Sequence, residues 1–220
     1  MALAKVKVVT GYIPIHNHPR SAEMYGELGE QLNELDAPLQ PYYSLLGTCW
    51  MTHMIDRLPF IPSWSVADNP KKNSLAYHCV NHQKFEWLYQ ASRAEDDTDT
   101  YIWIDYGICS VPGVTPQIIN EFLKKVKKND LAIPGCWDPQ GDAFDDAFVN
   151  WRFCGGVLVV PRRYVQELNN GIKAVALINA MQTKNITWEV NTLAHLERQH
   201  KVPIRWYKAD HNEQLFRNYR

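Results

Sequence analysis

Residues 101–107 read YIWIDYG, and this stretch decides the fold. Its first four residues are aromatic or β-branched, which favours a strand, and Tyr106-Gly107 ends the run as a turn. Asp105 therefore follows a buried strand directly. Because α/β proteins place their ligands at the carboxyl ends of the strands, the stretch predicts a ligand-binding carboxylate at that edge of a sheet.

Outward from this strand, strand-like and helix-like patterns alternate. Upstream, residues 5–13 predict a first strand, Ser21 is expected to cap a helix to about Asp36, and proline-rich residues 37–73 predict irregular connections with one or two short strands or turns. A helix then opens at Asn73 or Ser74 and ends near residue 94. Downstream, the patterns predict a helix from Pro116 to about 128, strands over 131–135 and 157–160, a helix over 163–182 with a break at Gly171, a helix over 188–200 capped by Thr187, and a strand over 203–208.

This alternation predicts the fold class. We expect an α/β protein with a three-layer, Rossmann-like architecture, in which helices flank a mixed, mostly parallel central sheet. The chain has 220 residues, of which 45% are hydrophobic and 21% are charged, enough for one well-buried core. We therefore expect residues 1–220 to form a single domain.

Charge and hydropathy exclude several classes of function. The net charge of -1 gives no global field for binding nucleic acid or an anionic membrane. The basic run Lys124, Lys125, Lys127 and Lys128 leaves a local DNA-binding patch open, although a solvated helix face is the simpler interpretation. No apolar run reaches the length of a membrane span, and residues 1–13 read as a strand without the features of a signal peptide. These patterns predict a cytoplasmic location.

The cysteines and tryptophans are unusual in different ways. The five cysteines are scattered singly, without the close pairs of a zinc site or disulfide framework, which predicts reduced and mostly buried thiols. Of the eight tryptophans, Trp103, Trp151, Trp188 and Trp206 lie beside charged or polar residues. Each is either a core ring or an aromatic platform for a sugar.

Three polar side chains are candidates for chemistry. Asp105 is a hard oxygen ligand suited to Mg²⁺ or Mn²⁺ on a diphosphate, or a simple turn former. Glu189 lies near the start of a predicted helix, where backbone dipoles favour an ionised carboxylate that can act as a general base. Lys84 falls on the apolar stripe of its helix, so it must either extend to water or find an anionic partner.

Two further features are weaker when taken alone. Gly155-Gly156 precedes a predicted strand, where backbone without a Cβ can approach a flat ligand such as a sugar. His211, between Asp210 and Asn212, is a candidate metal or phosphate contact or a surface residue.

Taken together, these segments resemble the nucleotide-diphospho-sugar transferases of the GT-A type. The likeness is strongest to the small bacterial HtrL/YibB-like group and its phage or viral relatives. It rests on the stretch from Asn73 to Ile108, which includes WIDYGI, and on WRFCGGVLVVPR, TWEVN and WYKADHNEQLFRNY. It covers residues 73–219 well, and the first 72 residues only in their opening strand and helix.

The resemblance implies specific roles for the residues. Asp105 would bind a Mn²⁺ or Mg²⁺ ion that bridges the donor phosphates, although Gly107 replaces the second Asp of the family's Asp-x-Asp motif. His211 would complete the metal shell, and Glu189 would be the catalytic base. The expected donor contacts are Thr10, Tyr12, Arg20, Lys84, Asp105, Tyr106, Gly107, Gly155 and Gly156, and the expected acceptor contacts are Trp188 and Asn191.

The resulting hypothesis is transfer of a hexosyl or pentosyl group from a nucleotide-sugar donor to a carbohydrate or other hydroxyl acceptor, with inversion if Glu189 is the base. Alternatives are a nucleotidyltransferase or nucleotide-sugar hydrolase, a non-catalytic protein that binds carbohydrate or nucleotide sugar, and a phage-type enzyme that glycosylates modified DNA bases. The residues GYIPIHNHPR do not supply the Gly-rich phosphate loop of the first alternative.

Overall fold

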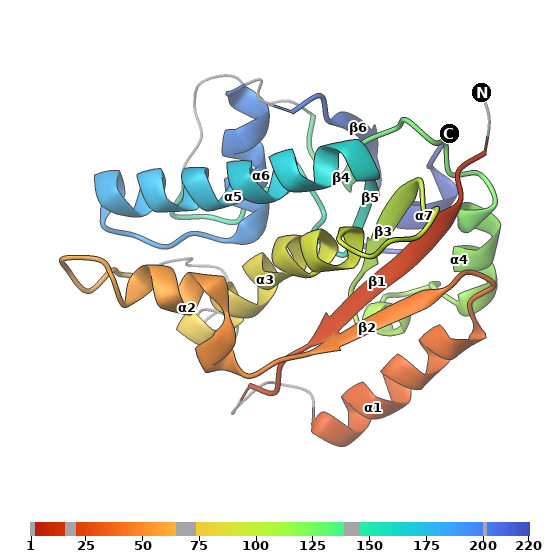
Figure 1. Ribbon diagram of the computed structural model, residues 1–220, viewed down its shortest axis with the longest axis horizontal. Coiled ribbons are helices and arrows are strands. Elements are labelled where there is room, and N and C mark those ends of the chain that lie inside the picture. Colours follow the sequence, from red (N-terminus) through yellow and green to blue (C-terminus); the bar gives the residue numbers. More distant parts are fainter. Residues whose placement is uncertain (1–2, 16–20, 65–73, 139–145, 200–201) are drawn as a thin grey trace.

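A computed structural model of the chain describes residues 3–15, 21–64, 74–138, 146–199 and 202–220. Six strands form one sheet in the order β2-β1-β3-β5-β4-β6 (Figure 1). The strands are β1 (Val6–Tyr12), β2 (Leu39–Tyr43), β3 (Thr100–Ile104), β4 (Ala132–Gly135), β5 (Val157–Pro161) and β6 (Arg205–Lys208). Strand β5 is antiparallel to β3 and β4, and the other neighbouring pairs are parallel. The prediction of a mixed, mostly parallel sheet is confirmed.

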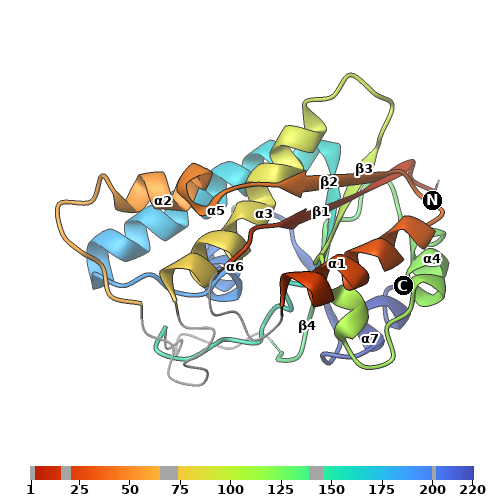
Figure 2. The same ribbon diagram turned by 90° about the horizontal axis from the view of Figure 1, so that it is seen from below.

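Helices cover both faces of the sheet (Figures 1 and 2). The α-helices are α1 (Ala22–Glu30), α2 (Trp50–Ile55), α3 (Leu75–Ser92), α4 (Pro116–Leu123), α5 (Arg162–Thr183), α6 (Glu189–Arg198) and α7 (Gln214–Arg217). Short 3₁₀ helices are η1 (Gln31–Glu34), η2 (Leu46–Thr48) and η3 (Ile108–Ser110). Helices α2, α3, α5 and α6 lie on one side of the sheet, and α1, α4 and α7 lie on the other.

Alternation along the strands separates two buried cores. In β3, Trp103 packs into the core beneath α3, α5 and α6, whereas Ile102 packs into the core beneath α4 and α7. The adjacent residues Val9 and Val8 of β1 divide in the same way. Successive side chains of a strand point to opposite faces, so strands buried on both faces must be apolar throughout, as β3 and β5 are. The three-layer prediction is confirmed.

The first half of the chain departs from prediction in one region. Ser21 caps α1 by accepting a hydrogen bond from the Met24 N–H at 3.1 Å, and Ser74 caps α3 in the same way through Tyr77, as predicted. The sequence predicted irregular connections in residues 37–73, with one or two short strands or turns around residues 42–55. The structure instead has the edge strand β2 at residues 39–43, which includes Pro41, and the helix α2 within the second stretch. Proline is tolerated in a strand at a sheet edge, and β2 is the edge strand.

The predicted break at Gly171 is wrong, because α5 is one continuous helix. A Cβ on Gly171 would lie 2.8 Å from Leu196 Cδ1, so the missing side chain lets α5 pack closely on α6. The N-cap of α6 is Trp188 without a side-chain cap bond, and not Thr187, so Glu189 is the first helical residue. Helix α4 ends at Leu123, which places the run of lysines after it in a turn instead of on a helix.

Within the described residues, none of the helices has the length and apolar character needed to span a bilayer.

Candidate functional site

A cavity of about 400 Å³ opens at the carboxyl ends of β1 and β3, between these strands and helices α3 and α6. Asp105 follows β3 directly, Lys84 lies on α3, and Glu189 begins α6. Side chains from these three elements all line the cavity. The position agrees with the general rule that α/β sheets bind ligands beyond the carboxyl ends of their strands.

The centre of the cavity is an ion cluster that we call the Lys84 clamp, made of Lys84, Asp105, Glu189 and the carbonyl of Gly155. The Lys84 ammonium donates to the Gly155 carbonyl at 2.7 Å and to Glu189 Oε1 at 3.1 Å, and it lies 3.5 Å from Asp105 Oδ1. Only 1% of the Lys84 side chain is exposed, against 42% for Asp105. Of the three N–H donors of this ammonium group, two form these hydrogen bonds and the third is left for the ion pair with Asp105.

Electrostatics keep this lysine charged despite its burial. Burial by itself lowers the pKa of Lys84, but the charges of Asp105 and Glu189 and their hydrogen bonds outweigh it and hold the pKa above its ordinary value of 10.5. The sequence left Lys84 either extending to water or pairing with an anion, and the structure shows the second. Lys84 orients two carboxylates, and its own donors are already used.

Glycine makes the clamp possible. A Cβ on Gly155 would lie 2.2 Å from Glu189 Oε1 and 3.0 Å from Lys84 Nζ. A Cβ on Gly156 would meet Ile108 Cδ1 at 3.3 Å and Asp105 Oδ2 at 3.5 Å. Gly155 is therefore needed for the approach of Glu189 to Lys84, whereas Gly156 leaves near-ordinary contact distances.

Asp105 is held from one side only. Trp103 Nε1 donates to Asp105 Oδ1 at 2.6 Å, and the Trp103 ring stacks on Trp87 with centroids 5.7 Å apart. Among the described residues, no hydrogen bond to Oδ2 is formed. Mg²⁺ commonly binds through one or two carboxylates while substrate phosphates and water complete its shell, so Asp105 Oδ2 fits a Mg²⁺ or Mn²⁺ ion held jointly with a diphosphate.

Two groups of aromatic rings line the cavity. In the first, the Tyr12 ring lies 5.2 Å from Tyr25 and 5.4 Å from Tyr106 between centroids. In the second, Trp188 packs against Tyr77 at 5.3 Å and Trp151 at 6.1 Å between centroids. Such rings suit the flat faces of a nucleobase or the apolar face of a sugar.

Most of the residues expected in the site do line this one cavity. They are Tyr12, Lys84, Asp105, Tyr106, Gly107, Gly155, Gly156, Trp188, Glu189 and His211. Thr10 and Asn191 are not among the lining residues, and both side chains are completely buried. Arg20 lies outside the described residues.

Asn191 stabilises a loop. Its amide donates to the Phe148 carbonyl at 2.8 Å and to Thr187 Oγ1 at 2.7 Å, and its oxygen accepts from the Asn150 N–H at 2.7 Å. With its amide hydrogens and oxygen used in this way, its position does not support the expected acceptor contact. Thr10 lies in the middle of β1, which explains why a contact assigned from topology alone falls in the core.

Sequence reasoning missed Tyr25 and Asn81 as lining residues, and it noted Tyr77 without placing it in the site. It named Trp151 as either a core ring or a sugar platform, and Trp151 lines the cavity. Tyr77, Asn81 and Lys84 are spaced by four and three positions on α3, so a polar stripe through the predicted helix was a usable signal. Tyr25 offered no comparable local pattern.

These features define an α/β protein with a mixed sheet and a charged, aromatic-lined cavity at the carboxyl ends of its strands. The structure is similar to the crystal structure of a glycosyltransferase involved in the glycosylation of the major capsid of PBCV-1, with a TM-score of 0.52. The match covers 93% of this chain and 81% of that chain, at 14% sequence identity. At this identity the likeness shows the fold. No family model matches the sequence, and no curated protein matches it.

Proposed function

We propose that this protein is a glycosyltransferase that moves a sugar from a nucleoside-diphosphate donor to a hydroxyl acceptor. One observation carries the proposal: two carboxylates from distant parts of the chain, Asp105 and Glu189, are fixed at one cavity by a single buried lysine. The fold shared with the capsid-glycosylating enzyme of PBCV-1 supports the same chemistry.

The two carboxylates would have different tasks. Asp105, whose Oδ2 oxygen accepts no hydrogen bond from the described residues, would hold a Mn²⁺ or Mg²⁺ ion together with the donor phosphates, and His211 lines the same cavity as the second expected ligand. Such an ion neutralises charge on the departing nucleoside diphosphate. Gly107 leaves Asp105 as the only carboxylate of its motif, so the donor's own phosphate oxygens would supply more of the shell.

Glu189 would accept the proton of the acceptor hydroxyl. It is the first residue of α6, where unpaired backbone N–H groups stabilise a carboxylate, and Lys84 engages its Oε1 oxygen. Among the described residues, no hydrogen bond to Oε2 is formed, so this oxygen is the one available to an acceptor. Attack by a hydroxyl that Glu189 activates, on the face opposite the leaving diphosphate, inverts the anomeric centre.

The two groups of aromatic rings that line the cavity suggest how the donor would be oriented. Tyr12, Tyr25 and Tyr106 would contact the nucleobase, while Trp151 and Trp188 would face the sugar and the acceptor. Lys84 would act as a positioning residue because its three donors are already used within the clamp.

The test is calorimetric titration with UDP, GDP and dTDP sugars, with and without Mn²⁺, followed by a transfer and hydrolysis assay with the donor that binds. Asp105→Ala should abolish metal-dependent binding. Asp36→Ala is the matched control, because Asp36 is an exposed aspartate paired with Lys124 and does not line the cavity. Absence of binding by every donor would overturn the proposal.

One observation favours a second candidate, a protein that binds nucleotide sugars without catalysis. Gly107 stands where the related enzymes carry their second metal-binding carboxylate. The same titration separates the two, because this candidate binds a donor yet shows neither transfer nor donor hydrolysis. The DNA-directed alternative has less support, since Lys124 pairs with Asp36 at 3.1 Å and Lys128 with Asp99 at 2.7 Å, which neutralises part of the basic run.

A further inference from the structure

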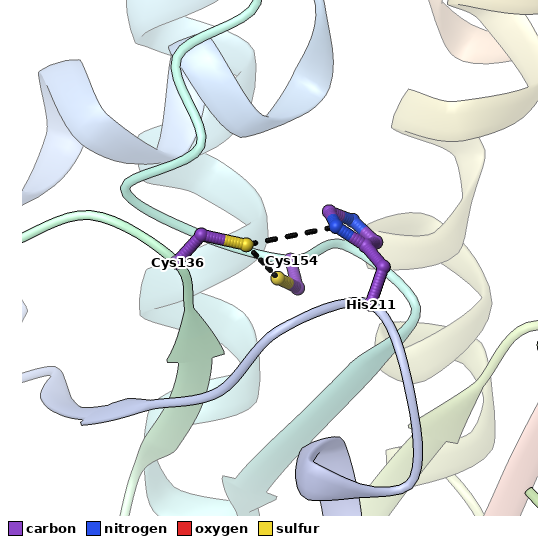
Figure 3. A group of neighbouring side chains, drawn as sticks. All are labelled: Cys136, Cys154 and His211. Carbon is purple, nitrogen blue, oxygen red and sulfur yellow. Dashed lines mark hydrogen bonds between the residues drawn. The ribbon is translucent and has the colours of Figure 1, made fainter. Parts of the chain in front are cut away.

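Two cysteines and a histidine converge beside the cavity. Cys136, Cys154 and His211, which we call the thiol cluster, each offer one ligand atom, and all three atoms lie within 4.8 Å of one another (Figure 3). The Cys136 and Cys154 sulfurs are 3.6 Å apart, and the Cys136 sulfur is 3.6 Å from His211 Nδ1. The scattered cysteines predicted no such site, and the proposed transferase chemistry does not use these thiols.

The sheet brings the three residues together. Cys136 follows β4 directly, Cys154 lies just before β5, and His211 lies just after β6. Because β5 runs antiparallel to β4, while β6 runs parallel to it, the start of β5 and the ends of β4 and β6 meet at the same edge. Figure 3 shows the three side chains pointing toward one another from these segments.

Backbone hydrogen bonds fix these segments against one another. The Cys154 N–H donates to the Pro134 carbonyl at 2.7 Å, the Cys136 N–H to the Trp151 carbonyl at 2.9 Å, and the Ala209 N–H to the Gly135 carbonyl at 2.9 Å. A metal site costs less to form where the protein has already ordered the ligand-bearing segments. The cluster therefore has the rigidity of a built site.

The separations of the ligand atoms agree with tetrahedral zinc. With Zn–S bonds of about 2.3 Å and Zn–N bonds of about 2.0–2.1 Å, tetrahedral angles place two sulfurs about 3.8 Å apart and sulfur and nitrogen about 3.6 Å apart. The measured sulfur–sulfur and sulfur–nitrogen separations are both 3.6 Å. Thiolate and imidazole ligands select Zn²⁺ and other soft ions over the Mg²⁺ or Mn²⁺ that suits Asp105.

We propose that Cys136, Cys154 and His211 bind one Zn²⁺ ion through two thiolates and an imidazole nitrogen, with a fourth position left for water or another ligand. Each thiol releases its proton to solvent as its sulfur binds, so the site takes up one divalent cation and loses two protons. Since His211 also lines the donor cavity, the ion would form part of the cavity wall. The site does not include Asp105, but it competes with the proposed Mn²⁺ or Mg²⁺ ion for His211. Its test needs neither a donor sugar nor transferase activity.

The thiols must lose their protons to bind a metal. Burial raises the pKa of both Cys136 and Cys154, so without a metal the sulfurs are protonated and weak nucleophiles, and the loss of their protons adds to the cost of metal binding. A disulfide between the two cysteines, which would need an external oxidant, is the competing outcome.

The experiment uses the full chain, purified under reducing conditions and freed of metal, and titrates it with Co²⁺ and then with Zn²⁺. We expect one Co²⁺ per chain, with a sulfur-to-cobalt charge-transfer band and the intense visible bands of tetrahedral cobalt, which Zn²⁺ then displaces. Cys136→Ser should remove the charge-transfer intensity of one sulfur. It should also weaken Zn²⁺ binding by at least about 100-fold, because loss of a residue that only contacts a metal ligand already costs up to about 100-fold.

Cys109→Ser is the matched control, since Cys109 is another partly buried cysteine outside the cluster and its loss should change neither the spectrum nor the affinity. His211→Ala should retain the sulfur band and weaken binding. Circular dichroism of each variant checks its fold. Octahedral cobalt spectra, an unchanged Cys136→Ser variant, or a disulfide formed by the reduced protein in air with no metal uptake would each overturn the proposal.

Discussion

The Lys84 clamp and the thiol cluster lie at the same edge of the sheet, but they differ in how their polar groups are satisfied. The clamp collects three charged groups, and its buried ammonium finds acceptors within 3.5 Å without any ligand. The thiol cluster collects two thiols and an imidazole, and its sulfur–sulfur and sulfur–nitrogen contacts are both 3.6 Å. The clamp is complete as folded, whereas the thiol cluster would gain most of its interaction energy from a metal.

The Lys84 clamp and the thiol cluster differ in whether they contribute to folding without a ligand. A buried charge must be paired when the chain folds, so the clamp contributes to folding and fixes two carboxylates as a consequence. Protonated thiols are small apolar groups that the core accepts without partners. Changes in the clamp should therefore affect stability directly, and changes in the thiol cluster should do so only when metal is present.

The largest effect should come from Lys84→Met. Removing the ammonium leaves Glu189 buried without its cation and the Gly155 carbonyl without its donor, and loss of one partner of a buried pair typically costs about 3–5 kcal/mol. The free energy of unfolding, measured by urea denaturation, should fall by that amount. Lys124→Met is the control: its partner Asp36 is exposed, so the loss should be under about 1 kcal/mol. Equal losses in the two variants would show that the clamp is not a buried charge cluster.

Acid should come next, and the effect above pH 4 should come mainly from two buried histidines. Burial, the first cause for each, lowers the pKa of His78 and His82 on α3 from 6.5 to about 4. Above pH 6.5 both histidines are neutral in the folded and unfolded chains. As the pH falls toward 4, only the unfolded chain takes up protons, so stability drops by up to about 3 kcal/mol for each histidine.

Urea denaturation between pH 4 and 8 measures this loss, and His82→Gln should reduce the slope by about half. The thiols remain protonated throughout this range because their pKa values are raised, so they add no slope. A flat profile between pH 6.5 and 4 would contradict the buried, neutral state of these histidines.

Zn²⁺ should act through the thiol cluster and not through the Lys84 clamp, and it should raise the free energy of unfolding. At a free Zn²⁺ concentration 100 times the dissociation constant, binding to the folded chain alone adds about 2.7 kcal/mol to the free energy of unfolding. Thermal denaturation with and without Zn²⁺ should show the increase in the native chain and not in Cys136→Ser. An equal increase in both would assign the ion to a different site.

The smallest expected effect is the difference in stability between the alanine variants of two neighbouring glycines. Gly155→Ala forces a Cβ to 2.2 Å from Glu189 Oε1, and such overpacking typically costs about 1–3 kcal/mol. Gly156→Ala meets its nearest atom at 3.3 Å and should cost under about 0.5 kcal/mol. Denaturation of the two variants measures the difference, and an inverted order would mean that Glu189 does not approach Lys84 across Gly155.

Local pattern accounts for the parts of the fold that were predicted. Strand β3 is aromatic and β-branched and buried on both faces, so its identity is fixed by its own residues, and Asp105 follows it by sequence alone. Ser21 and Ser74 cap their helices through residues three positions away, which is also a local contact. The prediction failed at Gly171 because a glycine in a helix signals a break unless another helix fills the space, and Leu196 of α6 does so.

The sequence by itself determined the order of strands and helices outside residues 37–73, and the position of Asp105 at a strand end. Only the tertiary structure decided that Lys84 meets Glu189, 105 positions away, and that Cys136 meets His211, 75 positions away. The physical reason is that hydrophobic periodicity and capping depend on residues a few positions apart. Contacts between distant residues instead depend on the order of the strands in the sheet and on the antiparallel direction of β5. The pattern of residues within a single strand encodes neither of these.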